Sequence, residues 1–70
     1  MNWMEALSSG IKDALWRSGS RRIAVHSEAQ AELGQRAAQR LGGENAKRLT
    51  FELIPENERD IYPVGVILAP

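Results

Sequence analysis

The chain has 70 residues, with nine Lys and Arg against nine Asp and Glu, so its formal net charge is zero. A chain of this length forms one domain over residues 1–70, which can bury only about 60% of the surface that the unfolded chain exposes. The absence of cysteine excludes disulfides and thiolate metal sites, and the zero net charge gives no overall field to attract nucleic acid or an anionic membrane. We therefore expect a thin core that a partner chain helps to stabilise.

The N-terminal segment predicts an amphipathic helix over residues 3–17. Its aliphatic residues recur every three or four positions, as on one face of a helix: Met4, Leu7, Ile11, Ala14 and Leu15. Asn2 and Glu5 are placed as a capping pair. Gly10 predicts a kink or break, since glycine costs about 1 kcal/mol relative to alanine in a helix. The segment shows neither a signal-peptide pattern nor a membrane-spanning run, so we expect a cytoplasmic protein.

A short strand and a second helix are predicted next. Ile23 and Val25 alternate with other residues, as in a strand. Ser27 and Gln30 have the spacing of a capping box, which predicts a helix over residues 28–41 that ends before a pair of glycines. We expect its apolar residues to face inward: Ala29, Leu33, Ala37, Ala38 and Leu41.

Two further strands complete the predicted α+β domain. Residues 49–53 alternate strictly and residues 64–68 form an almost unbroken apolar run, whereas the charged segment 55–63 between them predicts a loop. Because the last strand is apolar on both faces, we expect it at the centre of the sheet, in a split β-α-β arrangement. The predicted order is α-β-α-β-β, with a three-stranded mixed or antiparallel sheet. We expect the second helix to cover one face of this sheet and the first helix to cover part of the other.

His26 and Ser27 have two interpretations. A serine and free backbone amides at a helix N-terminus can bind an anion, with His26 as the titratable partner. We favour the alternative, in which Ser27 caps the helix and His26 only ends a strand, because such caps start most helices. The glycines of a nucleophile elbow and of a phosphate-binding loop are absent, and one histidine gives no metal-ligand spacing. We therefore expect no catalysis, no cofactor and no metal.

Aromatic residues are the best candidates for a protein-binding surface. Trp3 and Trp16 flank the first helix, and aromatic residues of this size are enriched at interface hot spots, although a core position explains them equally well. Ile61 and Tyr62 stand at the far end of the 55–63 loop, and such loops are either functional or merely mobile. Tyrosine is a typical amphipathic contact residue. We expect these four residues to contact a partner.

Basic residues form a second candidate set, for nucleic-acid or anion contact. Its members are Arg21, Arg22, Arg36, Arg40, Lys47 and Arg48. If they gathered at the strand starts and along the second helix, they would bind phosphates. We favour a solvated face with interspersed acidic residues, since the net charge is zero and no aromatic residue for base stacking lies nearby.

We therefore expect a small protein-binding domain that acts as an interaction, regulatory or inhibitor protein. One alternative is a structural subunit of a homo-oligomeric assembly, such as a phage virion. A second alternative is a weak nucleic-acid binder, whose affinity would fall steeply with salt. The Ala- and Arg-rich composition suggests a bacterial or phage genome.

Overall fold

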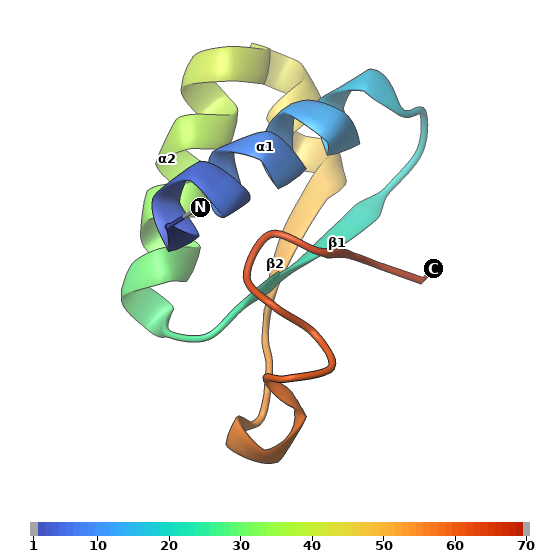
Figure 1. Cartoon of the computed structure of the whole chain (residues 1–70). Helices are drawn as coiled ribbons and strands as arrows, with labels where there is room; N and C mark the ends of the chain where they lie inside the picture. Colours follow the sequence, from blue (N-terminus) through green and yellow to red (C-terminus); the bar gives the residue numbers. More distant parts are fainter. Residues whose placement is uncertain (1, 70) are drawn as a thin grey trace.

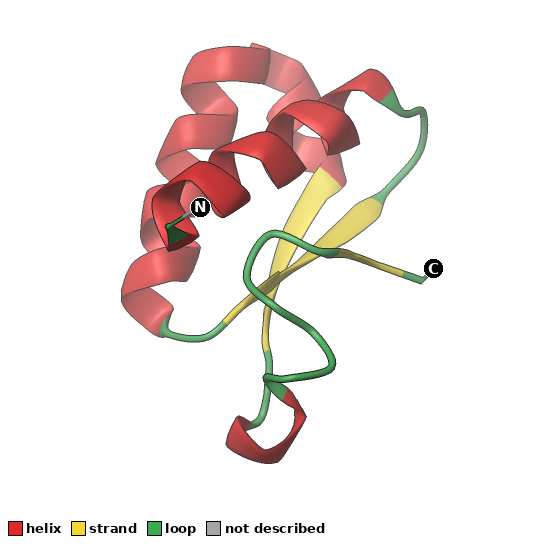
Figure 2. Cartoon of the chain, in the orientation of Figure 1, coloured by secondary structure: helices red, strands yellow, loops and turns green. Residues whose placement is uncertain are grey.

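The computed structural model describes residues 2–69 and consists of two helices on one side of a three-stranded sheet (Figures 1 and 2). The elements are α1 (Trp3–Trp16), β1 (Arg21–Val25), α2 (Glu28–Gly42), η1 (Gly43–Arg48), β2 (Leu49–Leu53), η2 (Glu56–Glu58) and β3 (Ile67–Leu68), where η1 and η2 are 3₁₀ turns. The predicted α+β class, the order of helices and strands, and a mixed sheet are confirmed.

The sheet has the order β2-β1-β3, so the predicted central position of the last strand is wrong. β2 lies parallel to β1, and the two-residue β3 lies antiparallel to it, with Ile23 beside both Phe51 and Ile67. The apolar run of residues 64–68, which ends in β3, has another cause: Val64 reaches the main core, whereas Leu68 packs on the opposite face of the sheet. Residues 64–68 are therefore apolar on both sides because this segment, at the edge of the sheet, contributes to the core clusters on both of its faces.

The central strand is β1, and it is the most deeply buried element of the sheet. Ile23, Ala24 and Val25 are each 0% exposed. Ile23 and Val25 face the helices, and Ala24 faces the other side, where Ile54 and Leu68 cover it. The split β-α-β arrangement is therefore corrected to a β-α-β unit, β1-α2-β2, with β3 added at the free edge of β1.

Both helices pack on the same face of the sheet, so the expected position of the first helix on the opposite face is wrong. Figure 1 shows α1 lying across α2 on one side of the strands. One core cluster contains residues of both helices and of the strands: Leu7, Ile11, Ala14, Ile23, Val25, Ala38, Leu49 and Val64. Because Ala14 and Ala38 have small side chains, α1 and α2 can approach each other closely over the sheet.

Gly10 does not kink or break α1, which runs without interruption from Trp3 to Trp16. A Cβ atom on Gly10 would overlap the backbone carbonyl of Gly65, and a Cβ atom on Gly65 would overlap the carbonyl of Ala6. Gly65 also has a φ of 90°, which side chains rarely tolerate. The two glycines therefore allow the backbone of α1 to touch the turn before β3, and this contact fixes where α1 lies.

The opposite face of the sheet is only partly covered. Ala24, Ile54 and Leu68 form a small second cluster, and the half-buried Tyr62 packs against it. Next to this cluster, Arg22 and Glu52 form an ion pair of 2.7 Å between neighbouring strands. The segment between β2 and β3 therefore replaces the first helix as the cover of this face.

Candidate functional site

The His26-Ser27 junction is held by structural hydrogen bonds. The Ser27 hydroxyl accepts from the backbone N–H of Gln30 at 3.1 Å, and the Gln30 side chain accepts from the backbone N–H of His26 at 2.7 Å. The predicted cap is therefore confirmed. His26 does more than end a strand: its Nε2 lies 2.8 Å from the carbonyl oxygen of Tyr62, and because a carbonyl only accepts, Nε2 donates. His26 thus fastens the segment before β3 to the end of β1.

Arg48, one of the six candidate anion-binding residues, closes the C-terminal end of α1. Its guanidinium donates to the carbonyl oxygens of Arg17 at 2.7 Å, of Gly19 at 2.8 Å and of Leu15 at 3.3 Å. The last carbonyls of a helix have no partner within the helix, so a planar group with several donors satisfies them well. Arg48 therefore links η1 to the end of α1.

Four of the other basic candidates lie on both sides of the sheet. Arg22 pairs with Glu52 on the open sheet face, and Lys47 pairs with Glu44 at 3.0 Å on η1. Arg36 and Arg40 are exposed on α2, on the other side of the sheet from Arg22. These four basic residues therefore lie in two different layers of the molecule.

Arg21 and Arg22 share a hollow with a basic residue outside the candidate set. This hollow lies between the end of α1 and the sheet, and its lining includes Arg17, Arg21, Arg22 and Thr50. Arg17 is 3.4 Å from Asp13, and Arg22 is paired with Glu52. Acidic neighbours therefore offset two of the three guanidinium charges.

Replacing Arg48 with Ala should lower the free energy of unfolding by about 1–2 kcal/mol, because three carbonyls at the end of α1 and in the turn after it lose a charged donor. Urea denaturation followed by circular dichroism measures this change. Arg36→Ala is the matched control, since Arg36 is exposed on α2, and should change the stability by less than about 0.5 kcal/mol. Equal effects of the two substitutions would contradict the capping role of Arg48.

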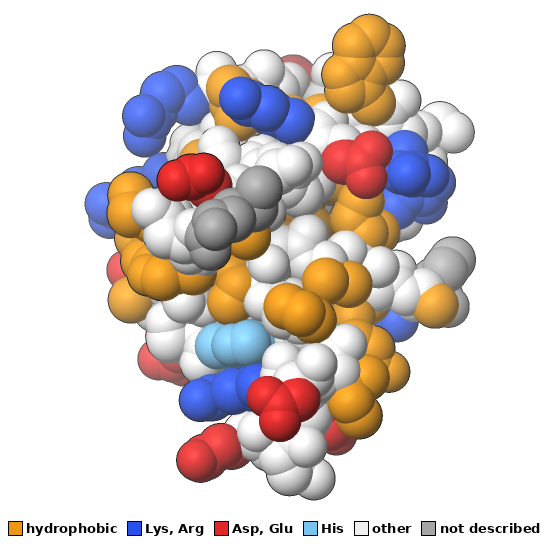
Figure 3. All heavy atoms as spheres, viewed as in Figure 1, with side chains coloured by type: hydrophobic (Ala, Val, Ile, Leu, Met, Phe, Trp, Pro, Cys, Tyr) orange, Lys and Arg blue, Asp and Glu red, His pale blue; other side chains and the backbone are white. Residues whose placement is uncertain are grey.

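Exposed apolar side chains gather along the line where α1 meets α2, which we call the helix seam. One hollow of the seam is lined by Trp3, Met4, Leu7, Ser8, Ile11, Leu33 and Ala37. A second hollow is lined by Lys12, Leu15, Trp16 and Leu41. Figure 3 shows hydrophobic side chains on the α1–α2 side of the molecule, with both basic and acidic side chains close by. The helix seam is therefore an apolar surface with one basic residue, Lys12, in its lining.

The structure places the four predicted contact residues in two regions. Trp3 and Trp16 border the two hollows of the helix seam, and they are 39% and 89% exposed. Ile61 is 67% exposed but belongs to the segment before β3. Tyr62 packs on the opposite face of the sheet from the helices. The tryptophans therefore share a surface that Ile61 and Tyr62 do not join.

Sequence reasoning missed the contribution of α2 to this surface. Leu33 and Leu41, which we expected to face inward, are 46% and 50% exposed, whereas Ala38 is buried as expected. The signal was present in the sequence as Leu33, Ala37 and Leu41, which recur every four residues and so form one stripe of the helix. This stripe lies at the contact with α1 and extends past it into solvent.

The comparisons with protein-family models, curated proteins and solved structures found no match to this chain. Within residues 2–69, no group of three or more His, Cys, Asp or Glu side chains could hold a metal ion. No helix in this described part is long and apolar enough to cross a membrane. The fold and the surface define a small α+β domain in two layers, with an exposed apolar seam between its two helices.

Proposed function

We propose that the chain is a non-catalytic protein-binding domain and that the helix seam is its binding surface. The observation that carries this proposal is the gathering of exposed large apolar side chains on the seam: Trp3, Met4, Leu33, Leu41 and Trp16. Contiguous exposed apolar surface on a small domain marks an interaction site, and tryptophan is the residue most enriched among interface hot spots.

The seam fits an amphipathic helix of a partner protein. The two hollows lie about seven residues apart along α1, which corresponds to about 10 Å or two helical turns. A partner helix with apolar residues at positions i and i+7 would place one side chain in each hollow. Lys12 lines the second hollow without an ion-pair partner among the described residues. An acidic residue beside the second anchor would pair with it.

The polar groups that suggest other functions are engaged within the fold, which supports binding over the alternatives. Ser27 caps α2, and His26 holds the carbonyl of Tyr62. Arg48 and Arg22 are bound by helix-end carbonyls and by Glu52 respectively. These contacts favour a structural role for the residues that a catalytic or nucleic-acid-binding function would use.

Peptides selected from a library of amphipathic helices test this proposal. For a selected peptide with anchors at i and i+7, the substitutions Trp16→Ala and Leu33→Ala should each raise the dissociation constant at least about tenfold. Fluorescence anisotropy of the labelled peptide measures the affinity. Trp16→Ala should also leave the melting temperature unchanged, because the side chain is 89% exposed.

Ile61→Ala is the matched control, since Ile61 is equally apolar and exposed but lies off the seam. It should bind the selected peptide like the parent chain. The proposal is wrong if no peptide of this pattern is selected, or if Ile61→Ala weakens binding while Trp16→Ala and Leu33→Ala do not.

A further inference from the structure

The two edges of the sheet differ in how well they are protected from pairing with another chain. β3 is only two residues long and follows Pro63 and the turn at Gly65. β2 is a regular five-residue strand, Leu49–Leu53, without proline, lysine or a bulge, which are the usual protections of an edge. Its only acidic residue, Glu52, is paired with Arg22 of β1. The edge of β2 is therefore open to a further strand.

The free edge of β2 presents unpaired backbone groups at alternate residues. The N–H of Ile54 donates to the carbonyl of Val25 at 2.9 Å, so the backbone groups of Ile54 point toward β1. Since residues of a strand alternate in direction, the N–H and C=O groups of Phe51 and Leu53 point away from β1. Neither residue has another hydrogen-bond partner within residues 2–69. The N–H of Leu49 donates to the carbonyl of Ala46 in η1, whereas the carbonyl of Leu49 points to the free edge.

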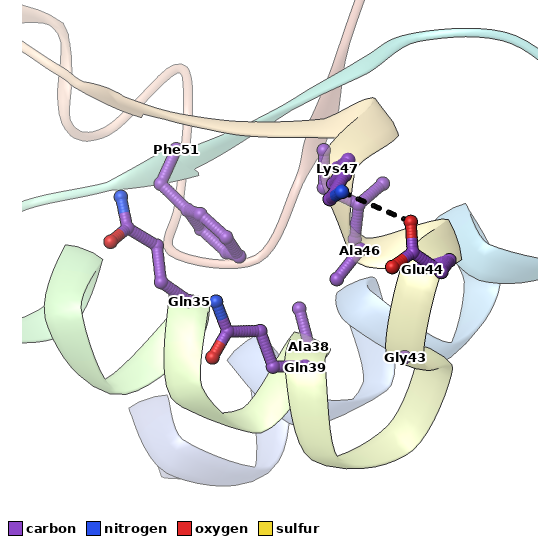
Figure 4. A pocket seen from close by; sticks show the side chains of 9 residues that line it. Gln35, Ala38, Gln39, Gly43, Glu44, Ala46, Lys47 and Phe51 are labelled. Carbon is purple, nitrogen blue, oxygen red and sulfur yellow. Dashed lines mark ion pairs between the residues drawn. The ribbon is translucent and has the colours of Figure 1, made fainter.

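A hollow of about 630 Å³ lies beside this edge (Figure 4). Its lining comes from α2, η1 and β2: Gln35, Ala38, Gln39, Gly43, Glu44, Ala46, Lys47, Leu49 and Phe51. The figure shows the Phe51 ring reaching from β2 toward α2, with the two glutamine side chains along the rim. At the other end of the same strand, Leu53 is 52% exposed. One strand therefore carries an exposed apolar side chain at one end and borders, at the other, a hollow with both apolar and polar lining residues.

We propose that a second copy of this chain pairs with the β2 edge, antiparallel and with Phe51 on the two-fold axis, to give one six-stranded sheet. In this register Phe51 exchanges two hydrogen bonds with its own copy, and the N–H of Leu53 donates to the carbonyl of Leu49 in the second copy. Leu53 and Leu49 then lie directly opposite each other on the helix face of the sheet, so each Leu53 is placed over the hollow of the other copy.

Charge disfavours the neighbouring register in which Glu52, rather than Phe51, lies on the two-fold axis. With Glu52 on the two-fold axis, the backbone groups of Phe51 would pair with those of Leu53 in the second copy, but two Glu52 carboxylates would face each other at the closest cross-strand position. With Phe51 on the axis, Glu52 faces Thr50, whose hydroxyl can donate to the carboxylate. The glutamines at the rim of the hollow are uncharged, and the net charge of each copy is zero, so the two copies do not repel each other.

The test measures the mass of the full chain by size-exclusion chromatography with light scattering, at concentrations from micromolar to millimolar. The parent chain should form dimers, and Leu53→Lys should raise the dimer dissociation constant at least tenfold. Leu53 is half-exposed, so this variant should keep the circular dichroism spectrum of the parent. Ile61→Lys, which puts the same charge on another exposed apolar residue, is the matched control and should still form dimers.

Cross-linking tests the register, since the chain has no cysteine of its own. The double variant Thr50→Cys, Glu52→Cys places the two new thiols of different copies opposite each other, at a separation that a disulfide can span. Mild oxidation should give covalent dimers, whereas Glu52→Cys alone should give few.

Three results would overturn the inference. The first is that the parent chain is monomeric at millimolar concentration, and the second is that Leu53→Lys leaves the dimer intact. The third is that Glu52→Cys alone cross-links as well as the double variant. A dimer that Trp16→Ala dissociates and Leu53→Lys does not would place the contact at the helix seam and would equally refute pairing through β2.

Discussion

Replacing Ile23 with Asp should unfold the chain. Ile23 is 0% exposed in the central strand and packs between both helices and the neighbouring strands. The core cluster around it consists of apolar residues only, so the new carboxylate would have no cation to pair with. Burying an unpaired charge costs several kcal/mol, which is comparable to the whole stability of a small domain. Circular dichroism at 25 °C should show loss of helix signal.

Val66→Asp is the matched control for this prediction. Val66 lies in the same apolar run that predicted a central strand, yet it is 37% exposed and precedes the two-residue β3. Its carbonyl accepts from Ala24, and the substitution leaves this backbone bond in place. Val66→Asp should therefore stay folded. An unfolded Val66→Asp together with a folded Ile23→Asp would show that the last strand, rather than β1, is central.

Replacing Gly10 with Ala should lower the free energy of unfolding by about 1–3 kcal/mol, although this exchange in an exposed helix normally stabilises by about 1 kcal/mol. The new Cβ would overlap the backbone carbonyl of Gly65, which has no rotamer to relieve the overlap. α1 would have to shift away from the turn before β3, and its contacts with β1 would loosen. Urea denaturation measures the change.

Ser9→Ala is the control for Gly10→Ala, because Ser9 is the neighbouring residue of α1 and is exposed. It should stabilise the chain by a few tenths of a kcal/mol through helix propensity alone. If Gly10→Ala stabilised the chain as Ser9→Ala does, the backbone contact between α1 and Gly65 would be absent in solution.

The sequence by itself determined both helices and the first two strands, because these signals act over a few residues, whereas the strand predicted over residues 64–68 is shortened to the two residues of β3. The capping residues Asn2 and Ser27 start both helices where predicted, each accepting from a backbone N–H three residues later. The alternation of residues 49–53 correctly predicted β2, and the glycines after residue 41 predicted the end of α2 to within one residue. The element order and the α+β class follow from this local information alone.

The tertiary structure alone decided the strand order, the layer of α1 and the composition of the candidate site. These depend on contacts between residues far apart in the chain, such as Gly10 with Gly65 and Arg48 with the end of α1. From the sequence alone, a glycine such as Gly10 can either bend a helix or allow another backbone segment to contact it. Only the tertiary structure shows that Gly10 does the second. For the same reason, the four-residue spacing of the apolar residues of α2 could not show that Leu33 and Leu41 extend past the core. Only the position of α1 determines how much of this apolar stripe is covered.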